Sequence, residues 1–192
     1  MSKITKYAMA AALKELTQKK NLSKITISDI TDKCGISRMT FYYHFKDIYD
    51  LVGWICNEDA AKAIGGKLEF SEWQKAYTSL GHLALENRVF VENVYHSMQK
   101  ENIERYMNGI TYRLLVQAIE EFSKEEPLPE EDVKFIANFF KHAFVGIELD
   151  WVRKGMKETP EDITDKLSTL IDGELRLAIK NFQKKNRNDI QL

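Results

Sequence analysis

The stretch ITISDITDKCGISRMTFYYHFKDIYDL, residues 25–51, decides the fold of this chain. Its apolar residues Ile27, Ile30 and Cys34 recur at the spacing i, i+3, i+7, so they share one face of a short helix. Gly35 follows where that helix must end, and glycine enters the left-handed backbone region without strain. The stretch therefore predicts two short helices joined by a tight turn.

Each of the two helices begins at a capping residue. Thr26 precedes the first helix and Asp29 follows three residues later, which is the arrangement of a capping box. Ser37 can cap the second helix in the same way. In the second helix, Phe41 and Phe45 are four residues apart, so both can face the core.

The other side of the second helix carries groups that suit contact with a nucleic acid. They are Arg38, Met39, Thr40, Tyr42, Tyr43 and His44. An arginine fork matches the O6 and N7 acceptors of guanine, and methyl groups contact thymine in the major groove. A helix pair of this kind is the sequence form of a helix-turn-helix, so we predict binding to duplex DNA. Packing of half-buried tyrosines in an ordinary helical protein is the alternative interpretation.

Residue identities strengthen the first interpretation. The matching features are Thr26, DIT at 29–31, GIS at 35–37, TFYYHF at 40–45 and Asp50-Leu51. Over roughly the first 55 residues the chain resembles the DNA-binding domain of the tetracycline-repressor (TetR) family of bacterial regulators. The resemblance implies an all-α fold, with an N-terminal three-helix helix-turn-helix domain and a larger C-terminal helical regulatory and dimerisation domain. YYHFKD with Trp54 is also similar to a subgroup that includes the activator of dihydroxyacetone-kinase operons.

The expected DNA contacts combine the exposed helix face with nearby hydroxyls and lysines. Arg38 is the expected base reader, and the resemblance implies backbone or base-edge contacts for both tyrosines and His44. Hydroxyls near helix N-termini and three lysines are expected to meet phosphates. The full set is Lys6, Lys24, Thr26, Ser28, Ser37, Arg38, Met39, Thr40, Tyr42, Tyr43, His44 and Lys46. Ile48 stands where relatives usually carry a phosphate-binding lysine, which leaves the DNA affinity open.

Charge is distributed unevenly along the chain. The 192 residues carry a net charge of -1, but residues 1–50 hold nine Lys or Arg against five Asp or Glu, a net of +4. A basic N-terminal part on an acidic remainder fits an electrostatic footprint confined to one end. Cys34 and Cys56 lack metal-ligand spacing, so we expect no metal or cofactor and a reducing cytoplasm. We expect no signal peptide or membrane span, and association with the bacterial nucleoid.

The remaining sequence predicts further helices and no strands. We expect a DNA-binding domain at 1–50, a linking helix at 51–66, an effector-binding and dimerisation domain at 67–187, and a disordered tail at 188–192. Gly65-Gly66 is the clearest internal boundary, and Ser71 with Gln74 resembles a second capping box. The expected helices include 5–19, 73–85, 90–97, 103–122, 130–153 and one last helix over 160–182.

Two sets of residues in the C-terminal part are expected to bind partners. Helix 130–153 and the last helix carry more apolar surface than their own domain needs, so a second copy can cover the excess. The expected dimer residues are Phe140, Phe144, Ile147, Trp151, Leu167, Leu170, Ile171 and Leu175. The expected effector pocket contains Trp54, Tyr77, His82, Tyr95, Tyr106, Tyr112 and Phe139. Ordinary core packing is the alternative for both sets.

Other classes of protein receive less support. The four histidines are scattered, and the sequence has no glycine-rich phosphate loop and no Glu-x-x-His motif of di-iron bundles, so an enzyme is not expected. The favoured function is a dimeric repressor that binds a palindromic operator and is released by an effector. An activator controlled by a partner protein, and a helical interaction module without DNA binding, remain alternatives.

Overall fold

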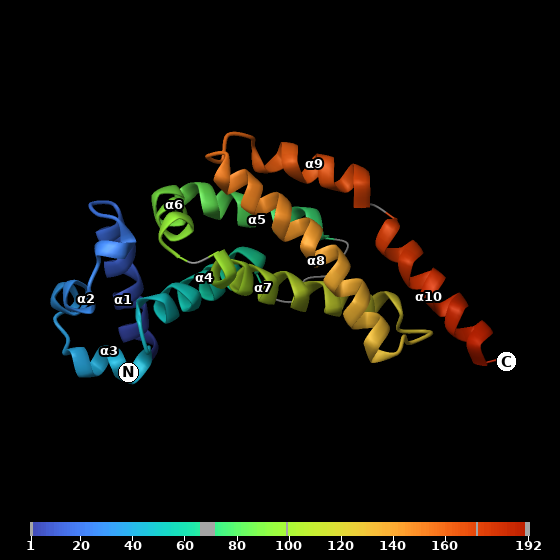
Figure 1. Ribbon diagram of the computed structural model, residues 1–192, viewed down its shortest axis with the longest axis horizontal. Coiled ribbons are helices and arrows are strands. Elements are labelled where there is room, and N and C mark those ends of the chain that lie inside the picture. The colour runs from blue at the N-terminus through green and yellow to red at the C-terminus, as the bar shows by residue number, and fades with distance from the viewer. Residues whose placement is uncertain (1, 66–71, 99, 172, 191–192) are drawn as a thin grey trace. The chain divides into compact units, whose positions relative to one another are not determined.

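The computed structural model describes residues 2–65, 72–98, 100–171 and 173–190, and within these ranges every regular element is a helix (Figure 1). The predicted all-α fold is therefore confirmed. The elements are α1 (Ser2–Thr17), the short 3-10 helix η1 (Leu22–Lys24), α2 (Ile27–Cys34), α3 (Arg38–His44), α4 (Ile48–Ile64), α5 (Trp73–Glu86), α6 (Arg88–Ser97), α7 (Lys100–Phe122), α8 (Glu130–Arg153), α9 (Pro160–Ile171) and α10 (Glu174–Ile190).

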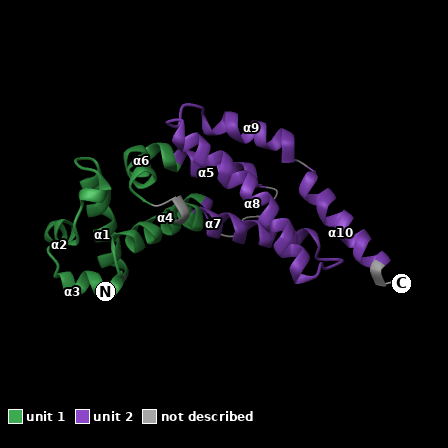
Figure 2. Cartoon of the chain, in the orientation of Figure 1, with its two compact units in different colours: residues 1–63, 83–106 green, residues 64–82, 107–192 purple. Residues whose placement is uncertain are grey.

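The chain forms two compact units (Figure 2). Unit 1 contains residues 1–63 and 83–106, and unit 2 contains residues 64–82 and 107–192. Both α5 and α7 contribute residues to each unit. These boundaries differ from the expected division at residues 50 and 66, because most of α4 and all of α6 cluster with the N-terminal helices.

The core of unit 1 is formed by residues of α1, α2, α3 and α4. Met9, Leu13, Ile30, Phe41 and Leu51 have no exposed side-chain surface. Burial of large apolar side chains of this kind contributes about 1.5–3 kcal/mol each relative to exposure. The position of α3 is therefore determined by packing on its inner side, which leaves its outer side free to vary.

The side-chain amide of Asn93 joins α6 to the N-terminal helices of unit 1. The side-chain oxygen of Asn93 accepts a hydrogen bond from the backbone N–H of Leu22 at 3.1 Å. Its nitrogen donates to the backbone oxygen of Thr17, at the C-terminus of α1, also at 3.1 Å. Both backbone groups lie at helix ends, which lack partners within their own helices. Asn93 therefore fastens α6 to the connection between α1 and α2.

Unit 2 is built mainly from α8, α9 and α10. Ala137 and Leu175 are fully or almost fully buried, and Leu167 is 2% exposed. The indole nitrogen of Trp151 donates to the backbone oxygen of Glu158 at 3.0 Å, which closes the turn between α8 and α9. Proline at the first position of α9, Pro160, agrees with the predicted helix start.

The C-terminal segment differs from the sequence prediction in two respects. The expected single helix over 160–182 is two helices, because Gly173 adopts φ +89°, which an α-helix cannot contain. α10 also continues through residues 188–190, which the sequence analysis had placed in a disordered tail. Residues 191–192, Gly66 and the Ser71 of the expected second capping box lie outside the described residues.

Candidate nucleic-acid interface

The turn between α2 and α3 is formed by the backbone of Gly35 and Ile36. Gly35 lies in the left-handed region at φ +66° and ψ +33°, and the N–H of Ile36 donates to the oxygen of Thr31 at 3.0 Å. The predicted C-terminal glycine of α2 is confirmed. Ser37 then caps α3, since its hydroxyl oxygen accepts from the N–H of Thr40 at 3.1 Å.

The predicted capping box at the start of α2 is also present. The N–H of Asp29 donates to the hydroxyl of Thr26 at 3.2 Å, and the N–H of Thr26 donates to the Asp29 carboxylate at 2.7 Å. The Lys20 ammonium lies 2.8 Å from the same carboxylate. Hydrogen bonding from Lys20, and then from Thr26, lowers the pKa of Asp29 to about 2. The box thus holds an ionised carboxylate that is already neutralised by a lysine.

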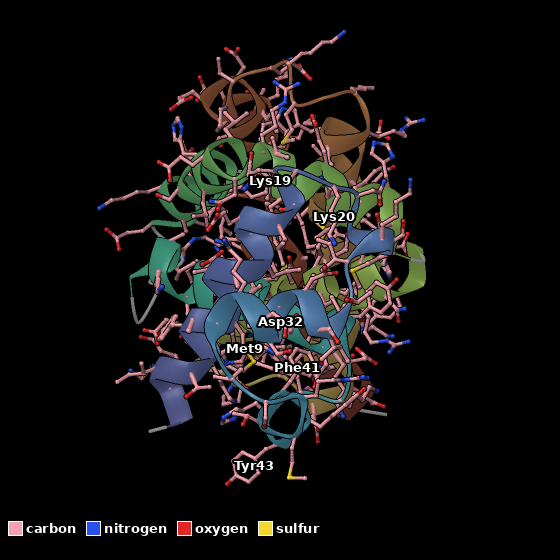
Figure 3. The ribbon with its side chains drawn as sticks, turned by 90° about the vertical axis from the view of Figure 1, so that its left-hand side faces the viewer. Met9, Lys19, Lys20, Asp32, Phe41 and Tyr43 are labelled. Atoms are coloured by element: carbon pink, nitrogen blue, oxygen red, sulfur yellow. The ribbon has the colours of Figure 1, made fainter. Side chains whose placement is uncertain are left out.

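The two faces of α3 differ sharply in exposure. Phe41 and Phe45 are 0% and 3% exposed, as predicted, whereas Met39 and Tyr43 are each 82% exposed. Figure 3 shows Phe41 lying among the helices of unit 1 and Tyr43 projecting away from them. Tyr42 is 51% exposed, with its ring edge-on to Phe41. Large apolar and aromatic groups held in solvent on one short helix indicate a binding face.

None of the expected DNA-contact residues is fully buried. Exposed positions are Lys24, Thr26, Ser37, Arg38, Met39, Tyr42, Tyr43 and Lys46. Half-buried positions are Lys6, Ser28, Thr40 and His44. All twelve belong to unit 1. A hydroxyl contacts a phosphate by donating its hydrogen, and the Thr26 hydroxyl already donates to the Asp29 carboxylate at 2.7 Å, so its expected phosphate contact would require that bond to break. The Ser37 hydroxyl shares a hydrogen bond of 2.9 Å with the Thr40 hydroxyl, in which either oxygen can be the donor.

Ion pairing separates the basic residues of unit 1 into two groups. Lys14, Lys20 and Lys33 pair with the carboxylates of Asp59, Asp29 and Glu15, at 2.5, 2.8 and 2.6 Å. By contrast, the described residues offer no ion-pair partner to the four basic side chains that were expected to contact DNA. These are Lys6, Lys24, Arg38 and Lys46. Basic side chains without an ion-pair partner are suited to contact phosphates.

Lys6 is held in place by aromatic rings. Its ammonium lies 5.4 Å from the ring centre of Phe45 and 5.8 Å from that of Trp54, within the range of a cation–π interaction. Phe45 is the residue at which α3 ends, so Lys6 of α1 is placed beside the end of α3. Trp54 was expected in the effector pocket, but it contacts Lys6, one of the residues expected to bind DNA.

The start of α4 has its own capping arrangement. The N–H of Asp50 donates to the Asp47 carboxylate at 2.8 Å, as at a helix cap. The N–H of Lys46 donates to the Asp50 carboxylate at 3.0 Å. Ile48 is half-buried at the position where a lysine was expected from the family resemblance. Lys46 is the exposed lysine closest in sequence to that position.

The residues expected to form an effector pocket do not come together. Trp54, Tyr95 and Tyr106 belong to unit 1, and the Tyr106 hydroxyl donates to the backbone oxygen of Tyr49 at 3.2 Å. His82 is exposed and lies 2.6 Å from the Glu161 carboxylate. In unit 2, Tyr112 lines a surface groove of about 480 Å³. Phe139 is 67% exposed.

Unit 2 instead has a cavity of about 70 Å³ between α5, α7 and α8, which Tyr77 lines. Trp73, Phe144 and Glu148 also line it. The sequence analysis did not assign Trp73 or Glu148 to a site. Trp73 at the start of α5 could have been noticed as an aromatic one helical turn before Tyr77. The surroundings of Glu148, which is half-buried, come from helices that are distant in sequence.

The expected dimer residues are largely buried within their own chain. The buried members are at most 7% exposed: Phe140, Phe144, Trp151, Leu167, Ile171 and Leu175. Phe144, for example, packs against Trp73 and Tyr77 of α5. The sequence pattern could not separate these core positions from outward-facing ones. Ile147 and Leu170 are 36% and 70% exposed. Phe135, Phe139 and Leu177 also expose large apolar side chains.

Several other functions find no support among the described residues. In these ranges no group of three or more His, Cys, Asp or Glu side chains is arranged to hold a metal ion. Cys34 and Cys56 are both free and half-buried, and burial raises the pKa of the Cys56 thiol to about 12. No helix in the described part of the chain has the length and apolar character needed to cross a membrane.

Comparison with known proteins gives two family matches. Residues 9–53 match the family described as bacterial regulatory proteins, tetR family. Residues 71–173 match the family described as transcriptional regulator C-terminal region. The first match contains α2 and α3, so it coincides with the helix pair that the sequence singled out. The second covers more than half of the chain.

Individual relatives agree with the family matches. The chain is 27% identical over 182 residues to the HTH-type dhaKLM operon transcriptional activator DhaS of Lactococcus lactis subsp. lactis (strain IL1403), covering 94% of this chain and 93% of that protein. A solved structure of the dihydroxyacetone kinase operon activator DhaS matches with a TM-score of 0.67 at 25% identity, covering 93% of this chain and 98% of that one.

A second structure extends the similarity at the level of the fold. NalD, the secondary repressor of the MexAB-OprM multidrug efflux pump in Pseudomonas aeruginosa, matches with a TM-score of 0.56 at 17% identity, covering 88% of this chain and 94% of that one. These families and relatives are transcriptional regulators and not enzymes. The chain belongs to the TetR family of bacterial transcriptional regulators and is a DNA-binding regulator.

Proposed function

We propose that this protein activates transcription by binding a palindromic DNA operator as a homodimer, with α3 of each copy in the major groove. The observation that carries the proposal is the exposed outer face of α3, where Met39 and Tyr43 are each 82% exposed while Phe41 is fully buried. Such a regulator would act in the cytoplasm, at the nucleoid. Control by an effector or a partner protein is part of the proposal.

The whole-length relative supports activation as the proposed sign of regulation. DhaS is named as an activator, and it aligns with 94% of this chain. The sequence analysis favoured repression on the family resemblance alone. NalD is named as a repressor, but at 17% identity its similarity supports only the fold. Activation is therefore the proposal and repression the alternative.

In the proposed complex, base reading and phosphate binding belong to different side chains. Arg38 is exposed on the first turn of α3, and its guanidinium can donate two hydrogen bonds to one guanine. Met39 and Tyr43 lie on the same exposed face and supply apolar contact. Three lysines of unit 1 can neutralise phosphates. Lys6 and Lys24 precede α3 in the sequence, and Lys46 follows it.

A surface on unit 2 supports the homodimer. α8 exposes Phe135 and Phe139 at 65% and 67%, and nearby Leu170 and Leu177 are 70% and 49% exposed. These four residues line one surface groove of about 430 Å³. We call them the apolar face of unit 2. Exposed apolar surfaces of this kind usually mark an interaction site, and isologous contact between two copies would let two α3 helices read a palindrome.

A DNA-binding measurement tests base reading. The full chain should select related palindromic fragments from a random duplex pool, and Arg38→Ala should weaken binding by about 1–3 kcal/mol and relax the preference at one base pair. Arg153→Ala is the matched control, because it removes the same charge from α8 in unit 2. If Arg38→Ala retains wild-type affinity and preference, Arg38 does not read a base.

Salt dependence separates phosphate contacts from base contacts. Lys46→Ala should weaken binding to all duplexes by a similar factor and reduce the slope of log affinity against log salt by about 1.

The sign of regulation is tested by transcription from the selected operator with and without the protein. Higher transcription with the protein supports activation, and lower transcription supports the alternative.

A further inference from the structure

One face of α6 makes polar contacts with the connection between α1 and α2. Asn93 bridges this connection, because its amide accepts from the N–H of Leu22 and donates to the backbone oxygen of Thr17, both at 3.1 Å. One turn further along α6, the Ser97 hydroxyl donates to the side-chain oxygen of Asn21, the N-cap of η1, at 2.6 Å. We call these hydrogen bonds of Asn93 and Ser97 the α6 clasp.

The amide of Asn93 is used as both donor and acceptor. Its oxygen serves Leu22, and its nitrogen donates to Thr17 and also to the backbone oxygen of Val89 at 3.1 Å. Thr17 and Leu22 are each 2% exposed, so little water reaches them to replace a lost partner. Removing a partner from a buried polar group costs more than the net value of the hydrogen bond. The α6 clasp therefore fixes a direction as well as a contact.

Side chains beside the α6 clasp join a third helix to it. Phe90 and Val94 of α6 are 4% and 9% exposed. The ammonium of Lys14, on α1, lies 5.7 Å from the ring centre of Phe90 and 2.5 Å from the carboxylate of Asp59, on α4. Within unit 1, α6 and α4 therefore both contact α1 through Lys14.

The helix pair of α2 and α3 is joined to the rest of the chain by two routes. The first is covalent, since α4 follows α3 along the chain. The second passes through the α6 clasp, since α6 follows α5 after the single residue Asn87, and α5 begins in unit 2. A helix pair that is held at two points has less freedom to rotate than one that is held at its end alone.

We propose that Asn93 is a positioning residue for DNA binding, whose amide fixes the orientation of the helix pair and thereby the separation of the two α3 helices in a dimer. The inference rests on the proposed binding of a homodimer to a palindrome. Two recognition helices bind a palindrome well only when their separation matches that of the half-sites, about 34–36 Å for one turn of DNA. Asn93 lies on α6, so it acts through the connection between α1 and α2 and not by touching DNA.

A positioning role and a purely structural role predict different binding data. Loss of folded protein would weaken binding to every duplex by the same factor. Loss of orientation would leave binding to a single half-site unchanged, because α3 is still packed on the core of unit 1 through Phe41. It would weaken binding only where both half-sites must be met at a fixed spacing.

Affinity measurements with the full chain on three kinds of duplex test the proposal. They are the palindrome that the wild-type chain selects, a duplex with one half-site, and palindromes with one base pair inserted or removed between the half-sites. Asn93→Ala should bind the single half-site as the wild-type chain does and lose about five- to a hundredfold on the selected palindrome. It should also discriminate less among the spacings, because a freer helix pair can adjust to each.

Asn186→Ala is the matched control. It removes an asparagine amide of α10 that donates to the Asp132 carboxylate at 2.8 Å, in unit 2. Its affinities for the three kinds of duplex should equal those of the wild-type chain. Far-UV circular dichroism confirms that the variants are folded.

Ser97→Ala keeps the test decisive if Asn93→Ala does not fold. It removes only the hydrogen bond to Asn21, so it should relax the spacing preference in the same direction by a smaller factor. Equal losses on the palindrome and the half-site, or a spacing preference that survives both substitutions, would overturn the role of Asn93 alone. A wild-type chain that binds the palindrome no better than the half-site would contradict the proposed function, and the positioning role with it.

Discussion

At the scale of the residue, Gly35 determines the turn on which α3 depends. Its φ of +66° lies in the left-handed region, where a side chain costs about 1–2 kcal/mol, although the space around an added Cβ is open. Gly35→Ala should therefore lower the free energy of unfolding by about 1 kcal/mol through backbone strain alone. Denaturant unfolding, followed by circular dichroism, measures the change.

Gly109 provides the opposite case for comparison. It lies inside α7, and an added Cβ would meet only the Arg113 guanidinium, at 3.9 Å. Gly109→Ala should stabilise the chain by about 0.5–1 kcal/mol, because alanine favours helix. If both glycine variants shift stability in the same direction, backbone conformation is not the cause of the Gly35 effect.

Glu148 gives a prediction about pH. Its pKa is about 7 in the folded chain against 4.5 for an ordinary glutamate, so the folded state holds a proton that the unfolded state has lost between these values. Stability should therefore fall as pH rises from about 4.5 to 7, and Glu148→Gln should raise the melting temperature more at pH 8 than at pH 4. Asp150→Asn is the control, and an equal rise at both pH values would contradict the assignment.

These residues also show which site features the sequence could predict. Thr26, Asp29 and Ser37 were predicted as caps because a cap depends on neighbours within three residues. The sequence analysis assigned no role to Glu148, although it lines the cavity. Its surroundings come from α5 and α7, and no local pattern reports contacts at such separations.

At the scale of the element, the close approach of α4 and α7 in unit 1 depends on the absence of a side chain. A Cβ at Gly53 would lie 2.2 Å from the Tyr106 ring. Gly53→Ala should therefore cost about 1–3 kcal/mol of stability through overpacking. In the Tyr106→Ala background, Gly53→Ala should cost less stability than it does in the wild-type chain. A double-mutant cycle of unfolding free energies measures this difference. Strict additivity of the two changes would argue against direct contact.

The helices themselves were largely predictable from the sequence. The prediction of 130–153 coincides with α8, because acidic residues follow Pro129 and apolar residues recur at helical spacing to Arg153. The break at Gly173 was missed, since the apolar pattern continues across it from Leu170 to Leu175. Helical periodicity reports which residues share a face, but it cannot decide whether that face meets its own chain or another.

At the scale of the whole molecule, the apolar face of unit 2 predicts self-association. Phe139→Asp combined with Leu170→Asp should convert a dimer into a folded monomer in sedimentation experiments, because both side chains are exposed within one chain. The monomer should lose most of its affinity for a palindrome and keep weak binding to half-sites. Val89→Asp, at a residue of α6 that is 40% exposed, serves as the control.

Two results would contradict this assignment. A wild-type chain that sediments as a monomer at all concentrations would show that the apolar face of unit 2 is not a homodimer interface. A double variant that remains dimeric would show that a different surface joins the copies. Loss of dimerisation in Val89→Asp would also point away from α8.

Lys6 has a consequence for how the protein meets a duplex. Long, flexible cationic side chains lose rotamer freedom when they are fixed on a target, at a cost of about 0.5–1.5 kcal/mol each. The rings of Phe45 and Trp54 hold the Lys6 ammonium within 6 Å of their centres before any target arrives. Part of the rotamer entropy of Lys6 is therefore lost when the chain folds, so less is lost on binding DNA. A phosphate would encounter a preorganised charge instead of a mobile one.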